Sequence, residues 1–193
     1  MVPKSESYFS LNLKTRRARR FGPPITLKII RATIKHLGLV LPLFDAYRHF
    51  YRQRSNLPGA RRFLRERLKR GESVIFLAVA RGWRISAPTG RDKNVVLTRR
   101  THLQLLGFVQ LYPSFDSVTM RRVWILYDLF VVPTARRSGV AKMLMERARQ
   151  FAVKTKAKGL ILETAVDNRP AQKLYEQLRW KRDTAFHRYY LDL

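Results

Sequence analysis

The stretch "VVPTARRSGVAKMLMERARQF", Val131–Phe151, changes character halfway along. It opens with two valines and a proline at the end of an apolar run, and it continues with two arginines, a serine and a glycine. Apolar residues then recur at the spacing of one face of a helix. They are Val140, Met143, Leu144, Ala148 and Phe151. The stretch therefore predicts a strand, a basic turn and a helix, in that order.

The start of the predicted helix has the features of an anion site. The first backbone N–H groups of a helix have no partner within the helix, and the helix dipole is positive there. Gly139 lets an anion approach the backbone closely, and the two arginines add charge. We therefore predict that a pyrophosphate binds to Arg136, Arg137, Ser138, Gly139, Val140 and Ala141. The alternative is an ordinary strand-to-helix turn with a solvated arginine pair.

Composition and motif searches exclude several kinds of site. Neither GxxxxGK(S/T) nor GxGxxG occurs, which excludes a P-loop and a dinucleotide fingerprint. The 193 residues include no cysteine, so there is no disulfide, thiolate metal ligand or cysteine nucleophile. The four histidines lack metal-ligand spacing, and we expect no metal site. No apolar run is long enough for a membrane span. We expect a cytoplasmic protein, which the lack of disulfides fits.

The charge of the chain is strongly positive and unevenly distributed. There are 40 Lys and Arg residues against 13 Asp and Glu residues, a net charge of +27. Six of the basic and five of the acidic residues lie from Gly159 onward, which leaves 34 and 8 in the first 158 residues. Such a field attracts polyanions. The two explanations are weak polyanion binding through the basic surface and a compositional bias of the source organism.

Patterning divides the chain into an extension and a domain. Residues 1–24 are polar and basic and end in Gly-Pro-Pro, which predicts a flexible N-terminal extension; an over-extended reading frame and a transit-like peptide are alternatives. Residues 25–193 form the predicted domain, in which residues 81–102 are a basic insertion in a hairpin. Strands are expected at 25–33, 73–80, 103–114, 121–132, 159–166 and 185–193, and helices at 37–51, 57–71, 140–152 and 168–180. This order predicts an α/β fold with a mixed sheet flanked by helices.

A second motif follows one strand later, in "DNRPAQKLYEQLRW". Together with Val131-Val132-Pro133 and the turn from Arg136 to Ala141, it resembles the GNAT superfamily of N-acetyltransferases, and the resemblance covers residues 25–193. The matching downstream residues are Asn168, Ala171, Leu174, Tyr175 and Trp180. The chain is most similar to the polyamine-type and histone-type small acetyltransferases. Arg179 stands where the family has a glycine, which puts the backbone geometry of that turn in question.

The resemblance implies a mostly antiparallel central sheet and acetyl-CoA as co-substrate. The basic turn is then expected to bind the pyrophosphate of acetyl-CoA, and backbone amides around Val131 and Val132 its pantetheine arm and thioester carbonyl. Asn168 is expected to hydrogen-bond the pantetheine, with a plain helix cap as the alternative. Tyr175 is expected to protonate the departing thiolate, with a packing role as the alternative. The amine attacks directly in a ternary complex.

The amine must lose a proton before it attacks, and two carboxylates are candidates to take it. Asp128 lies within an otherwise apolar strand, and Glu163 lies on the next predicted strand. A structural role is the alternative for both. Asp45, Tyr47 and Tyr112 are further candidates to line the acceptor entrance.

The acceptor is the least defined part of the prediction. The resemblance implies a primary amine of a polyamine-like small molecule, but a +27 chain repels polycations, so an amine of a protein or peptide is an equal alternative. A basic nucleic-acid-associated protein on the same scaffold and an inactive paralogue are the competing functions. A homodimer is compatible with the sequence.

Overall fold

The computed structural model describes residues 26–83 and 101–193. The extension predicted at 1–24 and most of the insertion predicted at 81–102 lie outside the described residues. The chain forms two compact units, which are described separately: the first runs to Ile161 and the second covers Leu162–Leu193.

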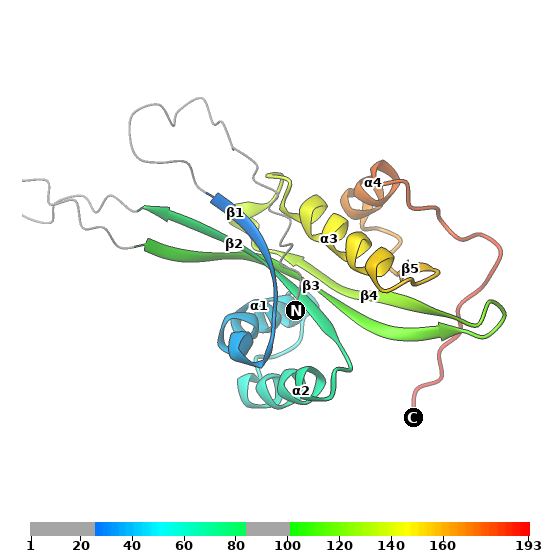
Figure 1. Ribbon diagram of the computed structural model, residues 1–193, viewed down its shortest axis with the longest axis horizontal. Coiled ribbons are helices and arrows are strands. Elements are labelled where there is room, and N and C mark those ends of the chain that lie inside the picture. The colour runs from blue at the N-terminus through cyan, green and yellow to red at the C-terminus, as the bar shows by residue number, and fades with distance from the viewer. Residues whose placement is uncertain (1–25, 84–100) are drawn as a thin grey trace, which may run out of the picture. The chain divides into compact units, whose positions relative to one another are not determined.

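A five-stranded sheet organises the first unit (Figure 1). Its strands, in both chain and spatial order, are β1 (Thr26–Arg31), β2 (Val74–Trp83), β3 (Thr101–Asp116), β4 (Arg121–Val131) and β5 (Gly159–Leu162). The first four pair antiparallel with their neighbours. A crossover through a helix joins β4 to β5, the type of connection that parallel neighbours need. The α/β fold class with a mixed, mostly antiparallel sheet is therefore confirmed.

Helices form where the sequence provides start and stop signals. They are α1 (Leu37–Phe50), α2 (Leu57–Arg70), α3 (Val140–Lys154) and, in the second unit, α4 (Arg169–Gln177), with short 3-10 turns at Ile34–His36 and Pro133–Ala135. The Asn56 side chain accepts the Gly59 N–H at 2.9 Å at the start of α2. Gly71 ends α2 with a left-handed φ of 67°.

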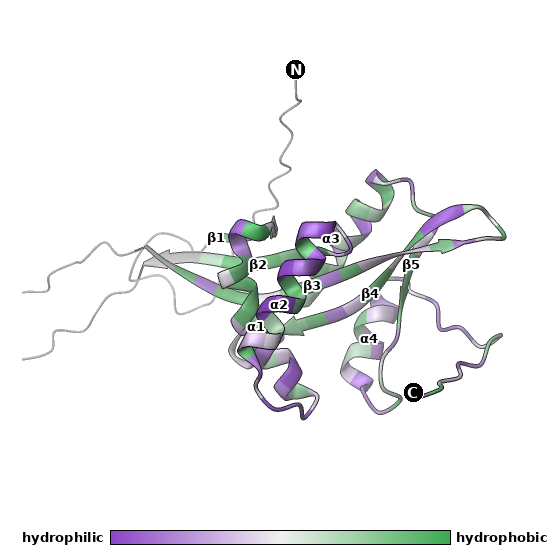
Figure 2. Ribbon diagram, turned by 90° about the horizontal axis from the view of Figure 1, so that it is seen from below, coloured by the Kyte–Doolittle hydropathy of each residue, from purple (hydrophilic) through white to green (hydrophobic). Residues whose placement is uncertain are grey.

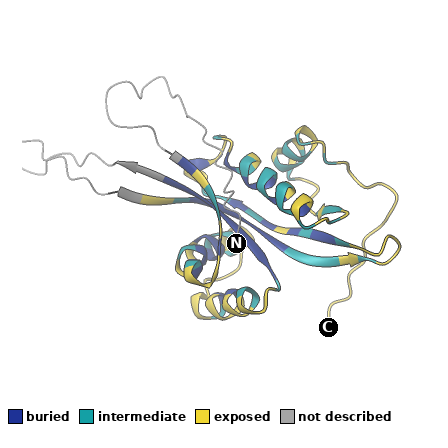
Figure 3. Cartoon of the chain, in the orientation of Figure 1, coloured by how far each residue is buried: buried dark blue, intermediate teal, exposed yellow. Residues whose placement is uncertain are grey.

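The two faces of the sheet bury different helices. Ile75 and Leu77 of β2 join a core cluster with α1 and α2. Phe76, which lies between them, packs against Phe151 of α3 with ring centroids 5.6 Å apart. Buried residues accordingly concentrate in the middle strands and on the inner sides of α1 and α3 (Figure 3). Each large apolar side chain buried here contributes about 1.5–3 kcal/mol.

The helices differ in how much apolar surface they carry. α1 buries six residues, whereas α2 buries only Ala60 and Leu64 and is hydrophilic over most of its length (Figure 2). None of the described helices is long and apolar enough to cross a membrane.

Two predicted strand segments are wrong. β5 ends at Leu162 rather than at residue 166, because local contacts replace the strand ladder. The carbonyls of Ala165 and Val166 accept the Gln172 side-chain amide at 3.1 and 3.0 Å. No strand forms over 185–193 in the described second unit, where Phe186, Tyr189 and Leu191 are exposed. An alternating pattern becomes a strand only when its backbone pairs with a neighbour.

Candidate functional site

The turn before α3 has the local structure of an anion site. Gly139 occupies the N-cap of α3 with φ 84°, and no side chain caps the helix. The first turn of α3 carries no acidic residue. The amides of this turn have no acceptor within the helix, and the dipole is positive at this end. A left-handed φ of this size favours glycine, so the backbone alone explains why Gly139 stands here.

The three residues before Gly139 shape the turn. Arg137 also adopts a left-handed φ, 59°. The Ser138 hydroxyl donates to the Ala135 carbonyl at 2.6 Å, and Arg136 Nε donates to the Val131 carbonyl at 3.2 Å. Both arginines are exposed, whereas the side chain of Val140 is buried beneath the turn. The residues present therefore fit a phosphate group: uncapped amides, a cationic rim and no carboxylate in the first turn of the helix.

The end of β4 leads directly into this turn. Val131 is the last residue of β4 and pairs with Gly107 of β3. The Val132 N–H donates to the Leu106 carbonyl at 2.9 Å, so this amide already has a partner. Gly107 lies so close to β4 that an added Cβ would approach the Phe130 carbonyl oxygen to 2.3 Å.

A β-bulge in β4 decides which way its acid faces. Gln110 pairs with Asp128 and Leu111 pairs with Leu126, so Tyr127 is an extra residue in β4. Before the bulge, Trp124 contacts Phe151 of α3, with centroids 5.0 Å apart. Strict alternation would place Asp128 on that same face. The bulge shifts the alternation by one residue and turns Asp128 toward α1.

Asp128 lies in a buried aromatic environment. Its exposed fraction is 4%. The Tyr47 hydroxyl of α1 donates a hydrogen bond to the carboxylate, and the Tyr47 ring packs against Phe130 of β4. Burial raises the pKa of Asp128 to about 6, and the Tyr47 hydrogen bond partly opposes that rise. At neutral pH the group is mostly ionised and is a competent proton acceptor.

Two more tyrosines border Asp128. Burial and the charge of Asp128 raise the pKa values of Tyr47 and Tyr112 well above their usual range. The Tyr112 and Tyr127 rings meet edge to face with centroids 5.6 Å apart. Tyr127, at the bulge, is 62% exposed. An aromatic border beside a carboxylate is suited to an ammonium group.

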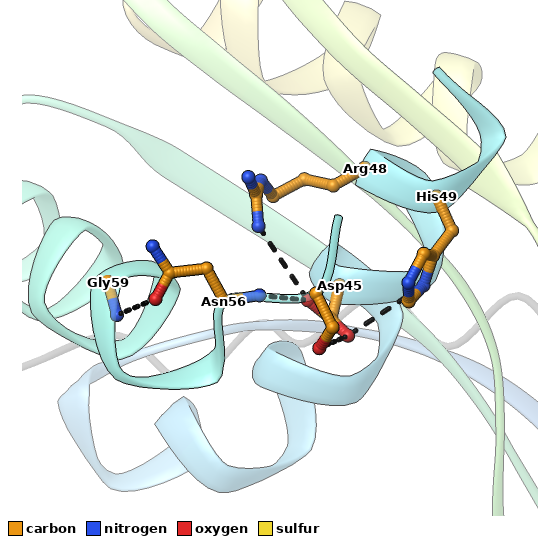
Figure 4. Close-up of polar contacts among 6 residues, drawn as sticks. Asp45, Arg48, His49, Asn56 and Gly59 are labelled. Carbon is orange, nitrogen blue, oxygen red and sulfur yellow. Dashed lines mark hydrogen bonds and ion pairs between the residues drawn. The ribbon is translucent and has the colours of Figure 1, made fainter. Parts of the chain in front are cut away.

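Asp45, the one acidic residue of α1, has a structural role (Figure 4). Its carboxylate accepts the Ser55 hydroxyl at 2.8 Å and the Asn56 N–H at 3.4 Å, and Arg48 and His49 lie 3.8 Å away. These contacts fasten the loop between α1 and α2. A cavity of about 300 Å³ lies beside it, lined by Phe44, Arg48, Asn56, Gly59, Ala60 and Phe63. Asp45 therefore does not line the surroundings of Asp128, unlike Tyr47 and Tyr112.

The remaining candidate residues belong to the second unit. Glu163 follows β5 instead of lying on it, is exposed, and pairs with Arg188 and the Tyr190 hydroxyl at 3.3 Å, so its predicted place on a strand is wrong. Asn168 occupies the N-cap of α4 without capping it; its side-chain amide donates to the Thr164 hydroxyl at 3.2 Å. Tyr175 is half-buried on α4, and its ring lies 6.2 Å from that of Trp180.

Sequence reasoning missed the bulge residue Tyr127 and the buried Gln110. The signal that selected Asp128, a polar residue inside an apolar strand, also applies to Gln110 in "LQLLGFVQLY". Within the described ranges 26–83 and 101–193, no group of three or more His, Cys, Asp or Glu side chains is arranged to hold a metal ion.

Known proteins resemble this chain in both sequence and fold. The model of the acetyltransferase (GNAT) family matches residues 81–179. An uncharacterised N-acetyltransferase of Bacillus subtilis, YhfO, is 40% identical over 86% of this chain and 98% of its own. A crystal structure of a probable acetyltransferase is 41% identical, with a TM-score of 0.70 over 86% of this chain and 97% of that one.

A more distant structure shares the fold. An aminoglycoside N-acetyltransferase solved in complex with CoA is 18% identical, with a TM-score of 0.65 over 88% of this chain and 97% of that one. The family model covers half of the chain and the relative at 40% identity covers most of it. This chain therefore belongs to the GNAT family, the acetyl-CoA-dependent N-acetyltransferases.

Proposed function

We propose that the protein transfers the acetyl group of acetyl-CoA directly to a primary amine, with Asp128 as the proton acceptor. The observation that carries this proposal is the position of Asp128, a buried carboxylate on the strand that leads into the uncapped start of α3. One short segment thus offers a base and, eight residues after it, an anion-binding turn. No covalent enzyme intermediate is needed.

The anion-binding turn is proposed to hold the cofactor. Acetyl-CoA supplies an activated acyl group as a thioester. The six residues of the turn, Arg136 to Ala141, bind its pyrophosphate, and the end of β4 at Val131 and Val132 contacts the pantetheine arm. The Val132 N–H must exchange its Leu106 partner to do so. Asn168 is the proposed side-chain contact to the same arm.

Each proton transfer is assigned to a residue. Asp128 takes a proton from the acceptor ammonium, which leaves a neutral amine able to attack. Tyr175 holds the proton that the departing thiolate takes up. Glu163 is the weaker candidate base because it is exposed and paired with Arg188.

The variant Y175F tests the proposed acid. Removing the hydroxyl is expected to lower kcat by about tenfold or more, as loss of a general acid does, with the affinity for acetyl-CoA unchanged. Calorimetry and steady-state kinetics measure the two quantities on the same preparation. An unchanged kcat across the pH range removes Tyr175 from the mechanism.

We propose that the acceptor is an amine on a molecule that is not itself a polycation. α2 exposes Arg61, Arg62, Arg65, Lys69 and Arg70 against one exposed acid, Glu66. Such a surface repels free polyamines and attracts amines carried by neutral or anionic molecules, including lysine residues of acidic proteins.

An acceptor screen tests both parts of the proposal. Release of CoA is followed with polyamines, amino acids, aminoglycosides and lysine peptides of opposite net charge. We expect the acidic lysine peptide to give a larger kcat/KM than the basic one, with the ratio decreasing as salt is added. A preference for spermidine contradicts the proposed acceptor class. Absence of acetyl-CoA binding by calorimetry, together with salt-sensitive binding of nucleic acid, supports the nucleic-acid alternative instead.

A further inference from the structure

Gln110 of β3 is a buried polar residue that the mechanism above does not use. Its exposed fraction is 0%, and neither its amide oxygen nor its amide nitrogen has a hydrogen-bond partner among the described residues. A buried amide left without a partner costs about 1–3 kcal/mol. The residue occupies the middle of an apolar strand where a leucine would fit, so this cost needs an explanation.

The strand register places Gln110 opposite Asp128. Gln110 pairs with Asp128 on one side and with Ile75 on the other. Ile75 belongs to the core cluster beneath α1 and α2. Residues directly opposite in antiparallel strands share a face, and their Cβ atoms lie about 4.5–5.5 Å apart. The amide and the carboxylate therefore lie next to each other on the buried face of the sheet.

The other groups around Asp128 leave room for a second donor. Tyr47 of α1 donates one hydrogen bond. Tyr112 and Tyr127 border the same area from β3 and β4. The positive charge of Arg67 on α2 lowers the pKa of Tyr112 and so opposes part of its rise. An ionised carboxylate accepts about four hydrogen bonds, so a single donor leaves most of its capacity unused.

We propose that Gln110 is a positioning residue for Asp128: a rotation of its side chain lets the amide nitrogen donate a hydrogen bond to the ionised carboxylate. The proposal rests on the proposed function, in which Asp128 is the proton acceptor. With Tyr47 on one side and Gln110 on the other, the carboxylate is held in one orientation toward the acceptor amine.

An amide is suited to this place because it serves both protonation states. While Asp128 is ionised, the nitrogen of Gln110 donates to it. Once Asp128 has taken a proton, the amide oxygen can accept the new O–H. Neither a leucine nor a glutamate at this position can do both, since one lacks polar groups and the other adds a second negative charge.

The variant Q110M, with I75V as the matched control, tests the proposal. Methionine keeps the length of the side chain but removes the donor, and Ile75 is the fully buried residue opposite Gln110 on β2. A hydrogen bond donated to the carboxylate stabilises its ionised form, so losing the donor should raise the pKa of Asp128 by about one to two units. The acid limb of the kcat/KM profile should move upward by the same amount, and I75V should leave it in place.

A measurement without acceptor or cofactor separates this inference from the proposed function. The difference in unfolding free energy between each protein and its D128N counterpart, followed through the pH range around 6, reports the ionisation of Asp128. The midpoint should lie higher in Q110M than in the parent protein. If Q110M does not fold, Q110L is measured in the same way.

An unchanged midpoint in the foldable variant overturns the positioning role and leaves the proposed function standing. Full turnover by D128N would instead contradict the proposed catalytic role of Asp128. The unfolding measurement would still show whether Gln110 controls the ionisation of Asp128.

Discussion

Asp128 and the turn before α3 lie on one continuous segment of the chain, but their surroundings differ in almost every physical respect. Asp128 is buried, negatively charged and bordered by tyrosines, whereas the turn is exposed, cationic and built from backbone amides. A buried carboxylate has a raised pKa and can accept one proton near neutral pH, while exposed amides at a helix start bind a large anion. Under the proposed function each region controls a different step: the turn controls cofactor affinity and Asp128 controls turnover.

The variant D128N has the largest expected effect. Loss of the proton acceptor should lower kcat/KM by about 100- to 10,000-fold, with acetyl-CoA affinity unchanged by calorimetry. Asparagine keeps the size of the side chain and can still accept from Tyr47. If D128N loses cofactor affinity as strongly as turnover, the division between the two regions is wrong.

The same variant should be more stable at alkaline pH. The pKa of Asp128 in the folded protein, about 6, lies above its ordinary value of 3.8. Its contribution to stability is therefore full below about pH 4 and is lost as the pH rises through 6. At pH 8 the parent protein holds a buried charge that D128N lacks, so the unfolding free energy of D128N minus that of the parent should be roughly 3 kcal/mol larger at pH 8 than at pH 4. Denaturant titration of both proteins at pH 4 and pH 8 measures these free energies of unfolding and checks the sign of the change.

The variant G139D should act on affinity instead. A carboxylate placed against the proposed phosphate site costs several kcal/mol, so we expect the Kd of acetyl-CoA to rise by about 100-fold or more. The control is G71D, because Gly71 also has a left-handed φ, 67°, and also has no atom within 4 Å of an added Cβ. Equal losses of affinity in both variants would mean that backbone strain, not the anion site, is responsible.

Smaller effects are expected from the two arginines of the turn. Both are exposed, so R136A and R137A should each raise the Kd of acetyl-CoA by about two- to fivefold, and added salt should shrink the difference. Calorimetry at low and high salt measures it. An arginine whose replacement leaves the Kd unchanged at low salt does not contact the cofactor and only contributes to the net positive charge of the protein.

The smallest effect is expected at Arg179, which has no role in the proposed mechanism. This arginine follows α4 with φ 64°, a conformation that costs a non-glycine residue about 1–2 kcal/mol. R179G should stabilise the protein by about 1 kcal/mol and leave the Kd of acetyl-CoA unaltered. R182G removes the same charge from a residue outside the left-handed region and should bring no gain. Equal stabilisation by both would point to charge rather than backbone strain.

The helices and inner strands could be predicted from the sequence because their signals are local. Asn56, Pro58 and Gly71 bound α2 by capping chemistry alone. The absence of a strand over 185–193 could not be predicted, because the alternating pattern around Tyr189 does not show whether a neighbouring backbone is present to pair with it.

The sites divide in the same way. The turn around Gly139 could be predicted from the sequence, since a glycine directly before an apolar helical pattern indicates a helix start. The face of the sheet on which the Asp128 side chain lies could not be predicted, since it depends on a bulge that appears only in the pairing of β4 with β3. The turn at Arg179 is a third case. The chain adopts a left-handed φ there although the residue is not glycine, so the sequence does not predict this conformation.

The extra residue at Tyr127 also shows where β4 tolerates a change of length. Leu126 already pairs with Leu111 and Asp128 with Gln110, so deleting Tyr127 would remove the bulge and its exposed side chain but leave both neighbours on the faces they now occupy. Phe130 would likewise keep its place in the core cluster. Alignments of distant relatives should therefore place a gap in this strand at Tyr127.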